Sequence, residues 1–381
     1  MGGRRTVLYY DFSGIYAEGK KVGCENLLIA GGKGNGKTFG ALRQGLKIFL
    51  GLESPEMTGY IIRYARRRKE SVKMNTIKNL FRPHEKWLEQ VTDGKWNRIV
   101  CRGNRFYMAL YDGDKQKARM QRECCVCNAL STWETDSGAD EGEAGIIIFD
   151  EAISREIELR DEFESLMKYH NNCRRNRMNY YCPLVLIGNT VTRDCTIFDN
   201  FGIDLWSIED EQQGHIQYVR NRVGKINCIF EWCGMAQVQE NAREYYDRFE
   251  KDETKMITDG VFSLGEYKTL QHKPESTDTV LRVAFIHPHF RLVCEYLVYN
   301  TTGDLLLYIT SPEHIDGCDI YINPRAVACN GSVRNFFEGR AAEIFRDAYI
   351  TKNIVYESPK TGEKYRSFAM DCIGLASCIP D

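Results

Sequence analysis

The sequence predicts an α/β protein with a mostly parallel β-sheet, followed by a smaller α+β domain. Residues 27–30 and 146–149 are continuous apolar runs, the pattern of parallel strands buried on both faces. Residues 39–50 follow the first run with the apolar spacing of a helix, as a strand–helix unit requires. Short strand-like runs joined by turns near the C-terminus predict the second domain.

Residues 31–38 join the first apolar run to the helical pattern. The segment consists of Gly31, Gly32, Lys33, Gly34, Asn35, Gly36, Lys37 and Thr38. Glycines let backbone N–H groups turn toward an anion, and the N-terminus of the helix adds a positive dipole. Lys37 supplies charge for the β- and γ-phosphates, and the Thr38 hydroxyl can bind Mg²⁺. The pattern predicts a P-loop NTPase of the RecA/ASCE-like type that binds ATP and Mg²⁺; the alternative is a glycine-rich turn without function.

The second apolar run ends in two acidic residues, Asp150 and Glu151. Ligands bind at the carboxyl ends of the strands in a doubly wound sheet. We expect Asp150 to hold Mg²⁺ together with Thr38, and Glu151 to orient or deprotonate the attacking water. Such a pair is weak evidence alone, but with a P-loop upstream it predicts the Walker B strand of an ATP hydrolase.

A third apolar run, residues 184–188, ends in Asn189 and Thr190, which we expect to sense the γ-phosphate. The polar turn before it contains Arg175 and Arg177. An arginine in such a loop can act as a finger that neutralises the transferred phosphoryl group in a neighbouring subunit. Both arginines are therefore candidate catalytic residues alongside Lys37; a surface cluster or a DNA contact is the alternative.

The charge of the chain is unevenly distributed, although its net value is only −2. Residues 61–82 contain eight basic residues and the single acidic residue Glu70. A run of this kind can contact nucleic-acid phosphates without sequence preference, or it can be a solvated face. The candidate DNA contacts are Arg66, Arg67, Arg68 and Lys69.

Composition limits the class of protein. A chain of 381 residues exceeds one compact core, and no apolar stretch reaches the length of a membrane span. The N-terminus has no apolar signal-peptide core, so we expect a cytoplasmic protein. Fifteen cysteines, an odd number, indicate free thiols, and one Cys-x-x-Cys at residues 124–127 without a second pair leaves a metal or redox site as a minor alternative.

The domain boundaries follow from these patterns: an ATPase domain at 1–205, a lid or linker subdomain at 206–275 and a C-terminal domain at 276–381. The last domain has strand-like runs at 280–286, 291–299 and 305–310 and a helical pattern at 331–350, the order in which an RNase H-like fold begins. Its first strand has no Asp, and two-metal hydrolysis needs clustered carboxylates. We therefore expect a nucleic-acid-binding or docking module without nuclease activity, although a cluster is conceivable for Asp304, Asp316, Asp319 and Asp371.

The order of these motifs resembles that in the DNA encapsidation ATPase of small podoviruses (Picovirinae type), a relative of large terminase subunits. The resemblance rests on the P-loop, the basic stretch, residues 129–131, the strand ending in Asp150 and Glu151, the Arg-Asn-Arg turn at 175–177 and the strand end at 188–190. It covers residues 20–200 by motif and the remainder by element order. One difference is that residues 131–143 lack the lysine that relatives carry before the Walker B strand.

The resemblance implies a ring-forming motor, a pentamer, that drives double-stranded DNA into a procapsid with ATP. It implies a location in the host cytoplasm, transiently at the portal vertex, and in some members a structural packaging RNA. Lys37, Thr38, Asp150 and Glu151 would form the site in cis, and Arg175 or Arg177 would reach it from the neighbouring subunit.

We interpret the sequence as an ATP-hydrolysing motor that translocates viral double-stranded DNA. A terminase large subunit with an active endonuclease is one alternative. A nucleotide-gated assembly or adaptor protein with slow turnover is another, and a cellular RecA-like helicase is a third.

Overall fold

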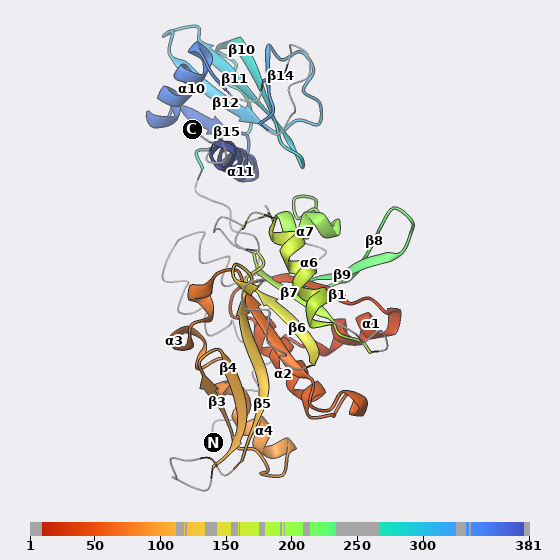
Figure 1. Cartoon of the computed structure of the whole chain (residues 1–381). Coiled ribbons are helices and arrows are strands. Elements are labelled where there is room, and N and C mark those ends of the chain that lie inside the picture. Colours follow the sequence, from red (N-terminus) through yellow and green to blue (C-terminus); the bar gives the residue numbers. More distant parts are fainter. Residues whose placement is uncertain are drawn as a thin grey trace, which may run out of the picture. The chain divides into compact units, whose positions relative to one another are not determined.

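The chain forms two compact units, Met1–Ser263 and Leu264–Asp381, in a computed structural model (Figure 1). The structure describes residues 10–111, 118, 120–133, 143–153, 159, 161–174, 180–190, 193, 195–208, 214–233, 267–324, 333–334 and 337–376. Within this part of the chain, no helix is both long and apolar enough to cross a membrane.

A nine-stranded sheet forms the centre of the first unit, with the strand order β3-β4-β5-β2-β6-β7-β1-β9-β8. The strands are β1 (Asn26–Gly31), β2 (Ile61–Arg66), β3 (Arg98–Arg102), β4 (Arg105–Leu110), β5 (Met120–Ala129), β6 (Ala144–Asp150), β7 (Leu184–Asn189), β8 (Ile216–Arg220) and β9 (Ile226–Cys233). The six strands from β5 to β9 in this order pair in parallel, whereas the β3–β4 hairpin and β8 add antiparallel strands at the two ends. The predicted mostly parallel sheet is confirmed.

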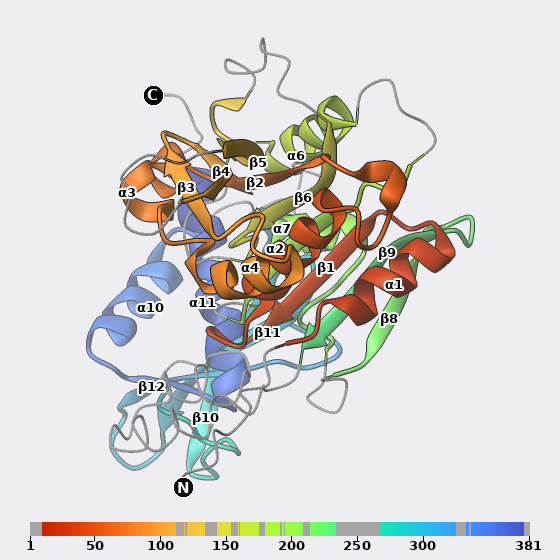
Figure 2. The same ribbon diagram turned by 90° about the horizontal axis from the view of Figure 1, so that it is seen from below.

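Helices cover both faces of this sheet. The helical elements are α1 (Ser13–Val22), α2 (Lys37–Phe49), α3 (Met74–Ile77), α4 (Glu85–Val91), α6 (Glu162–Cys173) and α7 (Thr196–Phe201), with 3-10 turns η1 (Pro55–Met57), η2 (Lys69–Val72) and η3 (Arg82–His84). Apolar side chains of α1 and α2 pack on one face, and those of α6 and α7 pack on the other. Figure 2 shows α2 and α6 on opposite sides of β6. Because both faces are covered, all seven residues of β6 are buried.

The structure differs from the predicted domain boundary at residue 205. Strands β8 and β9 belong to the large sheet, and β9 pairs in parallel with the P-loop strand β1, Leu27 opposite Ile229. The compact unit extends to Ser263, so residues 216–233 are part of the ATPase fold instead of a separate lid. Sequence periodicity identifies strands but not the strands beside them in the sheet. The pattern at 216–233 is therefore also compatible with the predicted lid subdomain.

The second unit is built on a six-stranded sheet with the order β14-β13-β10-β11-β12-β15. Its elements are β10 (Thr277–Ile286), β11 (Arg291–Tyr299), β12 (Leu305–Thr310), β13 (Ile320–Ile322), β14 (Val333–Arg334), α10 (Arg340–Ile350), β15 (Ile354–Tyr356) and α11 (Pro359–Ala376). The three predicted antiparallel strands are present, and the α+β character of this domain is confirmed. The helix expected at 331–350 begins at Arg340, and the short strand β14 (Val333–Arg334) lies in the first part of that range.

Three of the four aspartates considered as a metal cluster have described side chains. Asp319 accepts a hydrogen bond from the backbone N–H of Arg282 at 2.8 Å, on β10. Among the described residues of the whole chain there is no group of three or more His, Cys, Asp or Glu side chains that could hold a metal ion. The side chain of Asp371 lies outside the described part.

Candidate nucleotide-binding site

The carboxyl ends of three adjacent parallel strands bring the predicted site residues together. Gly31 at the end of β1 lies opposite Asn189 at the end of β7. On the other side of β7, Asp150 of β6 lies opposite Ile187 of β7. Because parallel strands end at one edge of the sheet, the P-loop, the Walker B carboxylates and the sensor residues meet at this edge. The structure thus brings the predicted residues together, and their roles stay a prediction.

The P-loop turns sharply between β1 and α2. Gly34 and Gly36 have φ angles of +86° and +95°, a region that residues with a Cβ rarely adopt. Gly31 has a different reason to be glycine: a Cβ there would lie 2.3 Å from the Sγ of Cys233 on β9. That thiol also accepts a hydrogen bond from the side chain of Asn35 at 3.0 Å, so β9 supports the underside of the loop.

Lys37 opens α2 and is almost fully buried, with 4% of its surface exposed. Its Nζ donates to the carbonyl oxygens of Gly31 and Gly32 at 2.9 and 2.7 Å and to Oδ1 of Asn189 at 3.2 Å. Burial lowers the pKa of Lys37, and the neighbouring Cys233 and Asp150 counteract part of this effect. The ammonium is therefore held inside the loop by carbonyl and amide oxygens.

The side chains of Thr38 and Asp150 contact each other, as a shared role in binding Mg²⁺ requires. The Thr38 hydroxyl donates to Oδ1 of Asp150 at 3.1 Å. The donors are hydroxyl and carboxylate oxygens, which Mg²⁺ prefers, so the residues present fit this ion. Thr190 lies next to them: its N–H donates to the Gly31 carbonyl at 3.2 Å, and its buried hydroxyl has no hydrogen-bond partner among the described residues. This buried donor at the site fits a ligand or water bound there.

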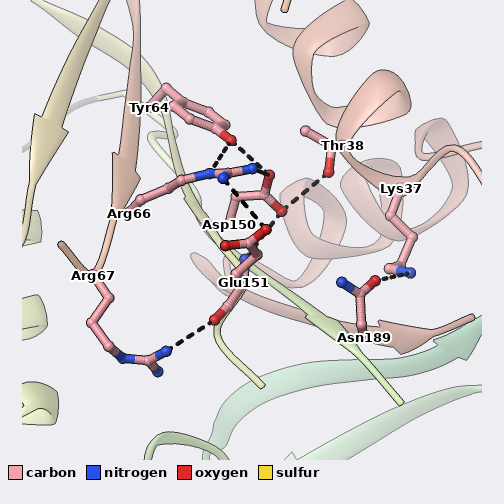
Figure 3. Close-up of polar contacts among 8 residues, drawn as sticks. All are labelled: Lys37, Thr38, Tyr64, Arg66, Arg67, Asp150, Glu151 and Asn189. Atoms are coloured by element: carbon pink, nitrogen blue, oxygen red, sulfur yellow. Dashed lines mark hydrogen bonds and ion pairs between the residues drawn. The ribbon is translucent and has the colours of Figure 1, made fainter. Parts of the chain in front are cut away.

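Arg66 faces this site instead of the solvent, which corrects its assignment as a DNA contact. Its guanidinium lies 3.2 Å from Oδ2 of Asp150 and 3.4 Å from Oε1 of Glu151 (Figure 3). Its Nε donates to the Tyr64 hydroxyl at 2.8 Å, and that hydroxyl donates to Asp150 at 2.6 Å. Although burial opposes it, the surrounding Tyr64, Asp150 and Glu151 raise the pKa of Arg66. Arg66 therefore contacts both Walker B carboxylates.

Arg67 is also wrongly assigned as a DNA contact, because its side chain is buried. Its Nε and Nη2 donate to the two carboxylate oxygens of Glu162 at 2.7 and 2.8 Å. Its Nη1 and Nη2 also donate to the backbone carbonyls of Glu151 and Ala152, at 3.4 and 3.1 Å. The next two basic residues, Arg68 and Lys69, are exposed. Of the four predicted DNA contacts, only these two remain at the surface.

The first turns of α2 pack against a buried histidine. The rings of Phe39 and His84 stack with their centroids 4.3 Å apart, and Nε of Arg43 donates to Nδ1 of His84 at 3.0 Å. Burial, with a smaller contribution from Arg43, lowers the pKa of His84 to about 3. The neutral ring can accept the arginine N–H, and it fixes the helix that carries Lys37 and Thr38.

The predicted arginine finger is not tested by the structure. Arg175 and Arg177 lie outside the described residues, and the adjacent Arg174 forms an ion pair with Glu25 at 2.6 Å. Sequence reasoning did not identify two side chains that contact the candidate site or its arginines, Tyr64 and Glu162. A signal for Tyr64 exists, since it precedes Arg66 by two residues and so shares its face of a strand; no local pattern marks Glu162.

The fold is that of a P-loop NTPase, and the predicted P-loop and acidic pair lie at one edge of its large sheet. The chain matches no protein-family model and no curated protein sequence. Its fold resembles that of a chain in the bacteriophage Phi-29 viral genome packaging motor assembly, with a TM-score of 0.52 and 14% identity over 96% of this chain and 99% of that one. This likeness shows the fold of a phage packaging motor, as the resemblance in sequence predicted.

Two further solved structures are similar at a lower level. The Phi-28 gp11 DNA packaging motor has a TM-score of 0.45 and 15% identity, with 94% of this chain and 95% of that chain covered. The large terminase ATPase domain of Thermus phage P74-26 has a TM-score of 0.35 and 10% identity, with 61% and 86% covered.

Proposed function

We propose that the protein is an ATP-hydrolysing motor that translocates double-stranded viral DNA into a procapsid. One observation carries this proposal: the run of four consecutive basic residues begins at the two acidic residues of the site and ends at the surface. Arg66 contacts Asp150 and Glu151, whereas Arg68 and Lys69 are exposed. A motor must change its grip on DNA with its nucleotide state, and this four-residue segment, 66–69, would connect the nucleotide site to the exposed cations.

Residues of the P-loop and of β6 would hold ATP and Mg²⁺. Lys37 lies within the loop to neutralise the phosphates, and the oxygens of Thr38 and Asp150 are suited to the ion. Bound Mg²⁺ would neutralise charge that develops on the phosphates. Asn189, which already contacts Lys37, would sense the γ-phosphate together with Thr190.

Glu151 is the residue that we assign to activation of water. Half of its side chain, 49%, is exposed, so a water molecule can reach it. Arg66 holds the carboxylate at 3.4 Å, and while this pair is intact the carboxylate is less available as a base. We infer that DNA contact at Arg68 and Lys69 moves the end of β2 and releases Glu151, so that hydrolysis depends on engaged DNA.

The assembly implied by this function is a homo-oligomeric ring, a pentamer by resemblance, at the portal of a procapsid in the host cytoplasm. In such a ring Arg175 or Arg177 would act on the site of the neighbouring subunit. The second unit, residues 264–381, would bind nucleic acid, a packaging RNA or the portal without cutting DNA. The finger, the ring and these partners remain predictions.

The direct test is ATP turnover by the purified protein, measured with and without double-stranded DNA. Glu151→Gln serves as the blank, because it keeps the shape of the side chain and removes the base. Turnover that rises with DNA and disappears in the variant supports the proposal. Turnover that is indifferent to DNA, at salt concentrations where DNA binds, contradicts it and favours a nucleotide-gated assembly protein.

A further inference from the structure

The residue after Asp150 has an unusual backbone conformation. Glu151 has a φ angle of +64°, in the left-handed region that residues other than glycine seldom occupy. Such a conformation persists only where the surrounding contacts impose it, and it often serves a functional site. In the candidate active site it sets the direction in which the Glu151 carboxylate leaves the end of β6.

Contacts to both the N–H and the carbonyl groups of this turn hold it, beginning with the Glu151 N–H, which donates to Oδ1 of Asp150 at 3.1 Å. On one side, the N–H of Ala152 donates to the Ile187 carbonyl of β7 at 2.8 Å. On the other side, Arg67 donates to the carbonyl oxygens of Glu151 and Ala152 at 3.4 and 3.1 Å. The thiol of Cys195 also donates to the Ala152 carbonyl, at 3.5 Å, but Arg67 is the charged donor and bridges both carbonyls.

Glu162 fixes Arg67 in this position. The two side chains form a bidentate ion pair at 2.7 and 2.8 Å, and only 5% and 3% of their side-chain surfaces are exposed. Glu162 Oε2 also accepts the N–H of Leu159 at 2.7 Å, so the carboxylate has a partner on each side. With both carboxylate oxygens occupied, the guanidinium plane is set, and its remaining N–H groups point at the turn.

A buried ion pair of this kind needs an explanation other than stability. Removing two charges from water costs about as much as their attraction returns, and an apolar pair of similar volume is often equally stable. Methionine at both positions would fill the space but would donate nothing to the two carbonyls. The pair is thus suited to fixing one conformation of the turn.

We propose that Arg67 and Glu162 are positioning residues that hold the turn after Asp150 and thereby aim the Glu151 carboxylate. This inference rests on the proposed function, since it concerns the residue assigned to activate water. Arg67 does not contact the reacting atoms; it acts through the backbone of Glu151.

The test is the double variant Arg67→Met/Glu162→Met, which removes both charges and leaves none unpaired in the interior. The control is Arg105→Met/Glu123→Met, an Arg–Glu ion pair of the same length, 2.7 Å, between β4 and β5, with 31% and 27% of its side chains exposed. Hydrogen exchange of the Ala152 amide reports on the turn without any need for activity. Steady-state kinetics with ATP reports on Glu151.

We expect the double variant to have the same melting temperature as the control. Its KM for ATP should be within twofold of that of the control. Its kcat should fall about 10- to 100-fold, because a misplacement of about 1 Å in a catalytic group has this effect. Protection of the Ala152 amide should be lost while that of residues 146–149 is unchanged. The single variant Arg67→Lys, which keeps the charge but has a single donor nitrogen, should recover part of the loss in kcat.

Retained protection of Ala152, or an unchanged kcat, would overturn the proposal. A loss of protection across residues 146–149 as well would also overturn it, because it would indicate a general structural role. If the wild-type protein showed no turnover at all, the proposed function would fail, and hydrogen exchange at Ala152 would still decide whether Arg67 holds the turn.

Discussion

Replacement of Arg66 by alanine should strengthen Mg²⁺ binding in the presence of nucleotide. The Arg66 guanidinium and the Tyr64 hydroxyl both contact Oδ2 of Asp150, and the Thr38 hydroxyl contacts Oδ1. Of these groups only Arg66 is a cation, so Mg²⁺ competes with it for the charge of this carboxylate. When a site is partly closed by an internal contact, the apparent affinity falls by the fraction of molecules in which it is open. Removing the contact restores that fraction.

The size of the effect follows from the two ion pairs of Arg66. Its contact with Asp150 is 3.2 Å long with 20% and 8% of the two side chains exposed, and hydrogen bonds to charged groups contribute about 1.5 kcal/mol at the lower end. The contact with Glu151 is longer, 3.4 Å, and Glu151 is 49% exposed, so it adds only a few tenths of a kcal/mol. A total of about 1–2 kcal/mol corresponds to roughly a 5- to 30-fold lower Mg²⁺ concentration at half-saturation.

The assay is binding of a fluorescent ATP analogue during a titration with Mg²⁺. Arg66→Lys keeps the charge but cannot bridge both carboxylates, so it should give an intermediate value. Lys69→Ala is the control for loss of a cation at the surface and should leave the titration unchanged. A half-saturation point that stays the same, or moves to higher Mg²⁺, in Arg66→Ala would refute the reasoning, because Arg66 would then support the ion instead of competing with it.

Three further predictions concern catalysis, DNA binding and stability. Glu151→Gln should bind nucleotide like the wild type in a fluorescence titration and lose about 10²- to 10⁴-fold in turnover, and weakened binding would contradict its assignment as the base. Arg68→Ala and Lys69→Ala should each reduce the slope of log affinity for duplex DNA against log salt by about 1, whereas Arg66→Ala should not; a reduced slope in Arg66→Ala would restore it as a DNA contact. His84 has a pKa of about 3 in the folded protein and about 6.5 when unfolded, so its neutral form favours folding and stability is lost as the pH falls from about 6.5 toward 3. The loss between pH 7 and pH 5 should be about 2 kcal/mol in denaturant titrations, and His84→Gln should abolish it; an equal loss in that variant would show that another group is responsible.

The parts of the site with a fixed local pattern could be predicted from the sequence. The P-loop needs glycines and a Lys-Thr pair at set positions between a strand and a helix, and residues 31–38 satisfy this need by themselves. The strand that ends in Asp150 and Glu151 is likewise a local pattern, an apolar run followed by two acids. Their meeting at one edge follows from the parallel sheet, so the sequence also indicated that these residues share a site.

The orientation of the basic run could not be predicted in the same way. Four consecutive cations give no sign of which side chains point inward. Arg66 reaches Asp150 only because β2 pairs directly with β6, Ala65 opposite Phe149, although a long segment containing β3, β4 and β5 separates the two strands in the chain. Glu162, which pairs with Arg67, comes from a helix on one face of the sheet. Contacts of this kind depend on the order of strands and not on local spacing.

The place of β9 in the sheet was missed for a related reason. A strand that pairs with β1 and a strand in a separate lid have the same apolar pattern. The sequence of residues 226–233 therefore does not indicate that this strand pairs with β1. The finger role of Arg175 and Arg177 remains a prediction.

The close approach of Gly31 to Cys233 has a consequence for natural variation of this fold. The two positions are far apart in the chain, yet a Cβ on the first would lie 2.3 Å from the sulfur of the second. Burial raises the pKa of Cys233 to about 11, so at neutral pH the side chain is an uncharged thiol that fills the space beside Gly31. Evolution therefore cannot treat the two positions independently: an alanine at position 31 would require a smaller residue at 233, and aligned relatives should show these positions changing together.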